Sequence, residues 1–165
     1  MICNKNITVA FTGHRDYDRC ADERIYASIV QLYSQGYRCF LTGMAWGFDL
    51  AAAEQVVRLR ELYHDVELIV VEPYASFRGL FHGADARRYD AIVAAATQRV
   101  VVGDNVGRRS YFLRNEYLVQ HSSYLVAWWN GEKGGGTAYT VKRALRDGLP
   151  VDNIYRSEYD LFSEL

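Results

Sequence analysis

The sequence predicts a three-layer α/β/α fold in which helices cover both faces of a mostly parallel central sheet. Short runs rich in Val, Ile, Tyr and Phe alternate with longer stretches of helical periodicity, which is typical of strand–helix units in a parallel sheet. Several of these short runs are apolar almost throughout, as expected for strands that are buried on both faces. We therefore expect them to be central strands.

The expected elements follow in order along the chain. The strands are Ile7–Thr12, Arg38–Thr42, Glu67–Glu72, Arg99–Val102, Tyr124–Trp129 and Val151–Ile154. The helices are Asp22–Gln35, Asp49–Leu62, Asp85–Ala96, Ser110–His121 and Thr137–Asp147. Gly36 follows the first helix, and Asp49 lies at the positive end of the second. Gly148 and Pro150 end the last helix before a strand begins.

The composition is that of a folded chain. Of the 165 residues, 50% are hydrophobic and 24% are charged, which excludes intrinsic disorder as the main state. This length fits one domain, residues 1–165, with a single core. The net charge of −1 provides no overall basic surface, so the composition does not favour binding to nucleic acid or to anionic lipid. Aromatic residues make up 14%, so some rings are expected at a pocket.

Cysteine spacing and hydropathy indicate the cellular compartment of the protein. Cys3, Cys20 and Cys39 are far apart and form no CxxC pair, so the sequence predicts neither a disulfide framework nor a zinc ribbon. No metal site and no cofactor is expected. The first apolar run, Ile7 to Phe11, is too short for a signal-peptide core, and no run approaches the roughly 20 residues of a membrane span. We therefore expect a cytoplasmic protein without membrane segments.

Loops that contain glycine follow three of the predicted strands. Ligands of open parallel sheets bind at the carboxyl ends of the strands, so we expect these loops to meet at one site. The strongest candidate is Gly134–Thr137, because glycines let backbone N–H groups approach an anion at the start of a helix. A flexible connection is the alternative. The absence of GxxxxGK[ST] and GxGxxG argues against ATP hydrolysis and dinucleotide oxidoreduction.

Polar side chains accompany these loops. Arg15 could bind a phosphate and His14 could hydrogen-bond or transfer a proton, or both could cap a neighbouring helix. Asp49 could accept hydrogen bonds from ribose hydroxyls or cap its own helix. Arg114 and Asn115 could supply a second cationic group for a phosphorylated ligand, or could be surface residues of their helix.

Two further groups of side chains are candidates. Glu54 lies further along the helix that Asp49 begins, among alanines, where a solvated position is the alternative. Aromatic rings could stack on a base, and we expect Trp46, Tyr139 and one of the pair Trp128 and Trp129 at the pocket. Neighbouring residues of a strand face opposite sides, so the other tryptophan of the pair is expected in the core.

Three motifs, in this order, resemble the SLOG superfamily and, more narrowly, its YspA/YpsA-type branch. They are Phe11–Arg15, Leu41–Glu54, and Arg114–Asn115 followed by Trp129–Gly131 and Gly134–Val141. The resemblance covers nearly the whole chain. It implies a Rossmann-like sheet that binds a nucleotide or nucleotide-derived ligand at its glycine edge, as a sensor or processing domain. Members often pair, so the resemblance also implies a homodimer.

The ligand-binding residues expected on these grounds are Gly13, His14, Arg15, Thr42, Gly43, Met44, Trp46, Gly47, Asp49, Arg114, Asn115, Gly134, Gly135, Gly136, Thr137 and Tyr139. One alternative function is N-glycoside hydrolysis of a nucleoside monophosphate, as in the related Lonely Guy enzymes, with Asp49 and Glu54 as the catalytic candidates. Those enzymes carry PGGxGTxxE, and here Thr140 stands in place of the catalytic Glu. A further alternative is single-stranded DNA binding, as in the related DprA proteins, which the balanced charge does not favour.

Overall fold

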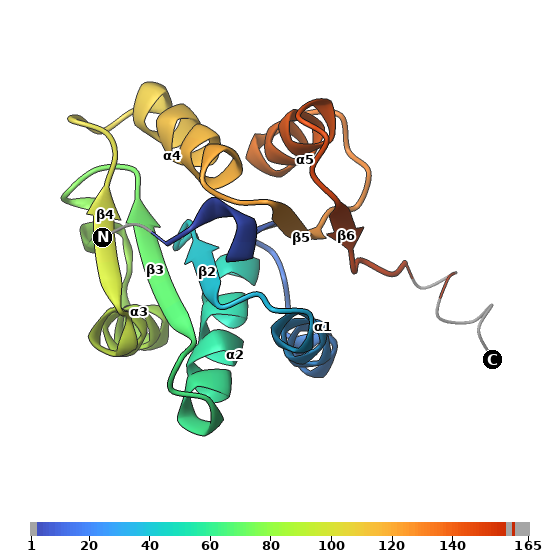
Figure 1. Ribbon diagram of the computed structural model, residues 1–165. Helices are drawn as coiled ribbons and strands as arrows, with labels where there is room; N and C mark the ends of the chain where they lie inside the picture. Colours follow the sequence, from blue (N-terminus) through green and yellow to red (C-terminus); the bar gives the residue numbers. More distant parts are fainter. Residues whose placement is uncertain (1–2, 158–159, 161–165) are drawn as a thin grey trace.

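The structure, a computed structural model, describes residues 3–157 and residue 160. Within this part of the chain, six strands form one all-parallel sheet in the order β4-β3-β2-β1-β5-β6 (Figure 1). The strands are β1 (Thr8–Gly13), β2 (Cys39–Thr42), β3 (Glu67–Glu72), β4 (Gln98–Val101), β5 (Tyr124–Trp128) and β6 (Val151–Asn153). All six predicted strands are therefore present, and each strand end lies within one residue of its predicted position.

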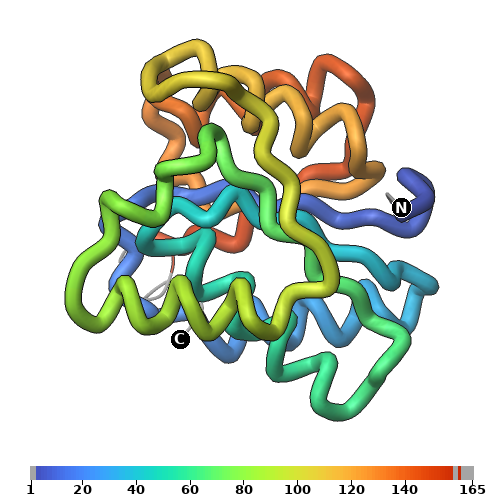
Figure 2. Tube along the Cα trace, turned by 90° about the vertical axis from the view of Figure 1, so that its left-hand side faces the viewer, coloured from blue at the N-terminus to red at the C-terminus, as the bar shows by residue number. Residues whose placement is uncertain are grey.

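Helices cover both faces of the sheet. They are α1 (Asp22–Ser34), α2 (Phe48–Leu62), α3 (Gly83–Ala95), α4 (Arg108–Gln120) and α5 (Gly136–Arg146). In the ribbon diagram and in the Cα trace, α1, α2 and α3 lie on one side of the sheet, and α4 and α5 lie on the other (Figures 1 and 2). The predicted three-layer α/β/α fold is confirmed. Two short 3-10 helices, Lys5–Ile7 and Phe77–Leu80, were not predicted.

The direction of chain progression reverses at β1, and this reversal divides the helices between the two faces. From β1 the chain adds β2, β3 and β4 on one side, then returns to place β5 and β6 on the other side of β1. Right-handed crossovers that progress in opposite directions put their helices on opposite faces. The carboxyl ends of β1 and β5 therefore flank the switch point at which open α/β sheets bind ligands.

Each face of the sheet has its own apolar core. Helix α2 lies at the centre of the larger core, and its residues Ala51, Ala52 and Ala53 are fully buried, which permits close approach to the sheet. Gly13 at the end of β1 leaves the space that the Phe48 ring fills, so a Cβ at this position would collide with the ring. Close packing of this kind brings the start of α2 against the end of β1.

Two expectations about the strands and cysteines are corrected. The strands β4 and β6 lie at the two edges of the sheet. Residues of β4 alternate between half-buried and exposed, so its apolar run does not mark a central strand. The structure also joins Cys3 to Cys39 in a disulfide, with Cα atoms 6.3 Å apart, although the sequence predicted none. A contact between residues 36 positions apart has no local sequence signal.

Across residues 3–157, no helix is both long enough and apolar enough to cross a membrane.

Candidate functional site

The loops after β1, β2 and β5 meet around a cavity of about 390 Å³. Its lining residues are Thr12, Gly13, His14, Arg15, Asp16, Ala45, Asp49, Arg114, Asn115, Leu118, Glu132, Gly134, Gly135, Gly136 and Thr137. The volume lies in the range of small-molecule sites, roughly 300–1,000 Å³. The three glycine loops thus converge as expected from the topology.

The start of α5 forms one wall of the cavity. Gly135 precedes the helix with a φ of +94°, a backbone conformation that favours glycine. Within the described residues, no side chain caps the N-terminus of α5, so its first N–H groups are not bonded by a cap. Thr137 adds a hydroxyl to the same wall. Such a helix N-terminus favours an anion.

Arg114 projects from α4 and is buried, with 7% of its surface exposed. Its Nη1 donates to the Gly43 carbonyl at 3.1 Å and its Nε donates to Asn115 Oδ1 at 3.3 Å, and both acceptors are neutral. Burial lowers the pKa of Arg114, and the charge of Asp49 partly opposes this effect. Because buried cations are usually paired, a guanidinium whose hydrogen bonds to the described residues reach neutral groups alone suits an anionic ligand.

Arg15 brings a second guanidinium to the cavity. It is exposed and lies 4.6 Å from the centre of the Trp46 ring. The ring of Tyr111 lies between the two cations, 5.8 Å from Arg15 and 5.3 Å from Arg114. Cation–π contacts orient both guanidinium groups without neutralising their charge. Tyr111 was not among the expected residues, but it precedes Arg114 by one helical turn, so helical spacing could have identified it.

Asp49 lies at the base of the cavity and is 5% exposed. Its Oδ2 accepts from the N–H of Ala45 at 3.3 Å, so Asp49 binds the loop that precedes α2. The N-cap of α2 is Gly47, and the Asp49 side chain does not cap the helix. Asp49 Oδ1 is buried and has no hydrogen-bond partner among the described residues. Burial raises the pKa of Asp49 from 3.8 to about 6, against the opposing effects of Arg114, the Ala45 N–H and Arg15.

The raised pKa of Asp49 predicts a pH-dependent stability. The folded protein holds this proton more tightly than the unfolded chain, so the unfolding free energy falls as the pH rises from about 4 to about 6. At 1.36 kcal/mol per pKa unit, the loss from this group amounts to about 3 kcal/mol. At pH 7, Asp49→Asn should therefore have a higher unfolding free energy than the wild type. At pH 4 this advantage should be absent. Urea unfolding across this range measures the difference, and parallel curves for the two proteins would contradict the prediction.

His14 connects the loops. Its side-chain Nε2 accepts from the Asn130 N–H at 3.0 Å. Its backbone N–H donates to the Trp128 carbonyl at 3.3 Å, and its backbone carbonyl accepts from the Phe48 N–H at 3.2 Å. These bonds link the loop after β1 to the loop after β5 and to the start of α2. His14 therefore helps to hold the cavity walls together.

Several expected binding residues lie behind the cavity wall. Thr42 Oγ1 donates to the Asp49 carbonyl at 3.2 Å and accepts from the Met44 N–H at 3.3 Å. A Cβ at Gly43 would lie 3.1 Å from Arg114 and from Asp49 Oδ2, so glycine permits these charges to approach the loop. Gly47, with a φ of +82°, lies against the backbone of the loop after β1. These residues support the lining and do not belong to it.

The expected aromatic stacking partners do not line the cavity. Trp46 lies against Arg15, and Trp128 is in the core, where its ring centre is 5.0 Å from that of Tyr17. Trp129 Nε1 donates to the Glu132 carbonyl at 2.9 Å and so fixes the loop before α5. Tyr139 donates to Glu116 and packs against α4, away from the cavity.

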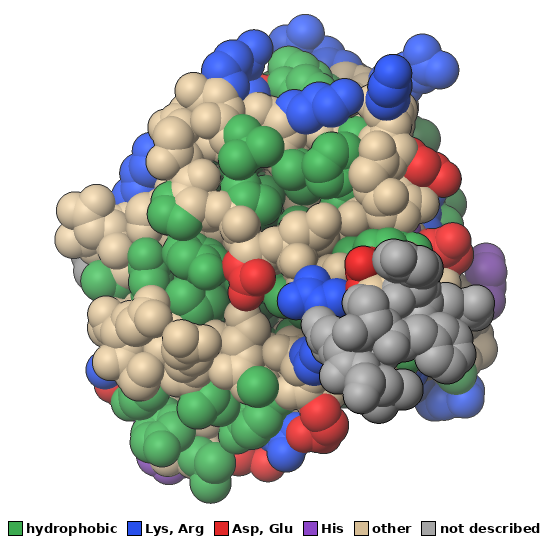
Figure 3. Space-filling model, turned by 90° about the vertical axis from the view of Figure 1, so that its right-hand side faces the viewer, with side chains coloured by type: hydrophobic (Ala, Val, Ile, Leu, Met, Phe, Trp, Pro, Cys, Tyr) green, Lys and Arg blue, Asp and Glu red, His purple; other side chains and the backbone are tan. Residues whose placement is uncertain are grey.

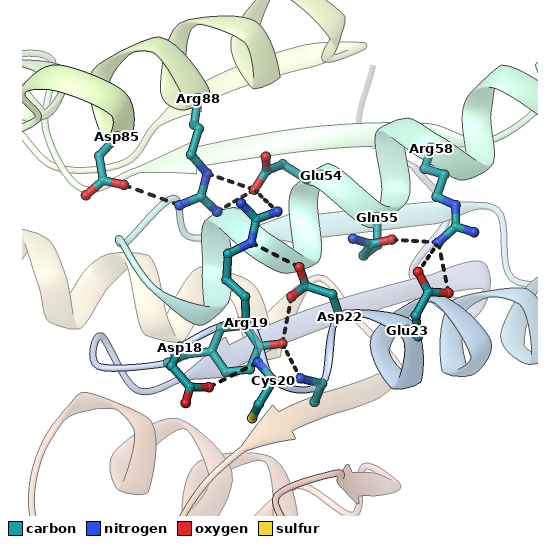
Figure 4. A network of polar contacts seen from close by, with 12 residues as sticks. Asp18, Arg19, Cys20, Asp22, Glu23, Glu54, Gln55, Arg58, Asp85 and Arg88 are labelled. Carbon is teal, nitrogen blue, oxygen red and sulfur yellow. Dashed lines mark hydrogen bonds and ion pairs between the residues drawn. The ribbon is translucent and has the colours of Figure 1, made fainter.

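Glu54 also lies outside the cavity, in a polar network between α1, α2 and α3 (Figure 4). Its Oε1 accepts from Arg88 Nε at 3.0 Å and lies 4.0 Å from Arg19 Nη2. Arg88 Nη1 in turn donates to Asp85 at 3.2 Å. Glu54 therefore joins the helices of the α1–α3 layer.

Five lining residues were not among the expected binding residues: Thr12, Asp16, Ala45, Leu118 and Glu132. Four of them, Thr12, Asp16, Ala45 and Glu132, lie in or next to the predicted glycine loops. Leu118 belongs to α4 and follows Arg114 by one helical turn, so helical spacing from Arg114 could have identified it as a lining residue.

Comparison with known proteins is consistent with this arrangement. A sequence model described as the YspA SLOG family matches residues 9–154. A UPF0398 protein of Halalkalibacterium halodurans is 30% identical over 122 residues, which is 70% of this chain and 62% of that protein. A UPF0398 protein of Bacillus cereus is 24% identical over 174 aligned positions, covering 95% of this chain and 91% of the relative.

Solved structures share the fold. DNA processing protein A from Streptococcus pneumoniae aligns with a TM-score of 0.66 at 20% identity, over 97% of this chain and 54% of that one. DNA processing protein A from Helicobacter pylori, described for its single-stranded DNA binding mode, aligns with a TM-score of 0.65 at 15% identity, over 93% of this chain and 67% of that one. The chain therefore spans only about half of the Streptococcus protein and less than two thirds of the Halalkalibacterium relative.

Proposed function

The chain belongs to the YspA SLOG family, and from this premise we propose that it binds a nucleotide or nucleotide-derived ligand in the cavity at the carboxyl edge of the sheet. The observation that carries the proposal is Arg114, a buried guanidinium at the cavity whose hydrogen bonds within residues 3–157 reach only neutral acceptors. The phosphate of the ligand would bind between Arg114, Arg15 and the N-terminus of α5. The ribose would lie toward Asp49.

Calorimetric titration tests this proposal. The ligands are AMP, cyclic AMP, ADP-ribose and NAD, and the proteins are the wild type and Gly135→Asp. A Cβ at Gly135 would meet open space, but the φ of +94° strains any other residue, so Gly135→Ala is the control for backbone strain. The added carboxylate of Gly135→Asp would in addition repel a phosphate at the helix N-terminus. We expect at least one of these ligands to bind the wild type and to bind Gly135→Asp more weakly. No binding at millimolar concentration, or equal binding by both proteins, would refute the proposal.

A second candidate function is hydrolysis of a nucleoside monophosphate at its N-glycosidic bond. In AMP, for example, water would lose a proton and attack C1′ of the ribose, and the C1′–N9 bond would break. Adenine would leave with a proton taken up from solvent, and ribose 5-phosphate would remain. Asp49 favours this candidate because a carboxyl with a pKa of about 6 is ionised at neutral pH and can accept the proton of the water. Thr140 does not assist, since it is fully buried and its hydroxyl donates to the Gly136 carbonyl.

Release of free adenine from AMP distinguishes hydrolysis from binding alone. Hydrolysis predicts adenine over several hours at high protein concentration, and none from Asp49→Asn. Glu54→Gln is the matched control, because Glu54 is a carboxylate of the same helix that lies outside the cavity and should not affect the release. If the wild type binds AMP and releases no adenine, the binding function stands by itself.

Single-stranded DNA is a third candidate, which the balanced net charge did not favour. The support is the fold shared with DNA processing protein A. Lysine and arginine side chains also line the upper edge of the face in Figure 3, the edge where α4 and α5 lie in Figure 1. The exposed residues Lys142 and Arg146 belong to α5. A gel shift with a single-stranded oligonucleotide that vanished at modest salt would indicate non-specific charge alone.

A further inference from the structure

Two cysteines and a carboxylate come together at the amino ends of the strands, the sheet edge opposite the nucleotide cavity. Cys39 begins β2 and Glu67 begins β3, and the two residues are paired across the parallel sheet. Cys3 approaches them from the segment before β1. One potential ligand atom from each residue lies within 4.8 Å of the other two. None of the three belongs to the cavity at the carboxyl edge.

The contact between Cys3 and Glu67 distinguishes the possible states of this cluster. Cys3 Sγ lies 2.7 Å from Glu67 Oε2, so the Glu67 carboxylate directly faces this sulfur of the disulfide. A disulfide sulfur has no proton to donate, so Glu67 gains a hydrogen bond from Cys3 only when Cys3 is reduced. Among residues 3–157, no Lys or Arg forms an ion pair with Glu67. Glu67 therefore favours a reduced thiol, or a cation, over the disulfide.

We propose that Cys3, Cys39 and Glu67 of the reduced protein bind one soft divalent cation, for which Zn²⁺ is the probe. Two thiolates and a carboxylate are ligands that Zn²⁺ accepts in tetrahedral sites. A second cavity, of about 610 Å³, adjoins the cluster and is lined by Cys3 and Glu67 together with Arg38 and Asp65. This cavity leaves the fourth position open to water or to an added ligand.

The chemistry of loading is a thiol–disulfide exchange followed by metal binding. A small dithiol reductant gives two electrons and two protons to the Cys3–Cys39 bond and becomes a cyclic disulfide itself. Zn²⁺ then displaces the two thiol protons, and the thiolates and the Glu67 carboxylate bind it. An excess of a small cyclic disulfide, which takes up two electrons and two protons and becomes a dithiol, would re-form the Cys3–Cys39 disulfide and release the metal. The site and the disulfide are thus mutually exclusive states of one cluster.

Metal titration of the full chain tests this proposal. The protein is reduced with dithiothreitol, desalted without oxygen, and titrated with Zn²⁺ against a chromophoric chelator. We expect one Zn²⁺ per chain, and none for the oxidised protein. Co²⁺ in place of Zn²⁺ should give the near-ultraviolet absorption of thiolate-to-cobalt charge transfer.

Three variants define the ligands. Cys3→Ser should lose binding, and Glu67→Gln should weaken it by more than the roughly 10–100-fold effect of losing a supporting hydrogen bond. Cys20→Ser is the matched control and should bind as the wild type does, because Cys20 is an exposed free cysteine. Cys39 is fully buried, so circular dichroism must confirm the fold of any variant there. Absence of Zn²⁺ uptake by the reduced wild type, or undiminished uptake by Cys3→Ser, would overturn the proposal.

Discussion

Arg114→Gln is expected to weaken binding of AMP by roughly 100-fold, the largest loss for any single side chain of the cavity. Removing one partner of a buried charge pair costs about 2–5 kcal/mol, and each 1.4 kcal/mol is a factor of ten in affinity. Glutamine retains hydrogen-bonding capacity toward the Gly43 carbonyl, which Arg114 now reaches at 3.1 Å, but it carries no charge for the phosphate. Calorimetry of both proteins with AMP measures the loss.

The matched control for Arg114→Gln is Arg109→Gln. Arg109 lies on the same helix, five residues earlier, and is exposed outside the cavity lining. Its loss should leave AMP binding nearly unchanged, because an exposed charge is screened by water and salt. An equal effect of the two substitutions would mean that general positive charge, and not the buried guanidinium, attracts the ligand.

Gly47→Ala is expected to lower the unfolding free energy by about 4 kcal/mol, because backbone strain and overpacking each cost roughly 1–3 kcal/mol. The φ of +82° at Gly47 suits only glycine, and an added Cβ would collide with the carbonyl oxygens of His14 and Arg15. Since backbone atoms cannot rotate aside as a side chain does, the loop after β1 must move. Urea unfolding measures the stability.

Gly36→Ala separates the two causes of this loss. Gly36 has a φ of +103°, but a Cβ added there would meet only open space, so its substitution carries backbone strain without a collision. We expect a loss of about 1–2 kcal/mol there, within the usual range for such strain. A loss at Gly47 no larger than at Gly36 would show that the collision with the loop is relieved at little cost.

The fold could be predicted because its signals are local. The strand β3 was expected at Glu67–Glu72 and lies there, since an apolar run between helical stretches suffices to define a buried strand. The edge position of β4 could not be predicted, because strand order depends on contacts between distant segments. The same reason applies to Cys3 and Cys39, whose approach depends on how the segment before β1 crosses the start of β2.

Site residues could be predicted where the sheet topology alone fixes their position. They could not be predicted where the orientation of a helix about its axis determines whether a side chain faces the cavity. Gly134–Thr137 and Arg15 follow strands directly, so their place at the carboxyl edge follows from the sheet. Asp49 and Glu54 both belong to α2, but five residues at 3.6 per turn place them on different sides of the helix. Asp49 therefore lies at the cavity, and Glu54 faces α3.

The position of β1 in the sheet has a consequence for the order of folding. Val9 of β1 pairs with Phe40 on one side and with Tyr124 on the other, so one neighbour is close in sequence and the other is distant. Contacts between distant segments form slowly, and during synthesis β2 is available long before β5. The nascent chain can pair strands β1 to β4 early, but the walls of the cavity at the carboxyl edge close only after α5 has left the ribosome. Ligand binding would then report completion of the fold.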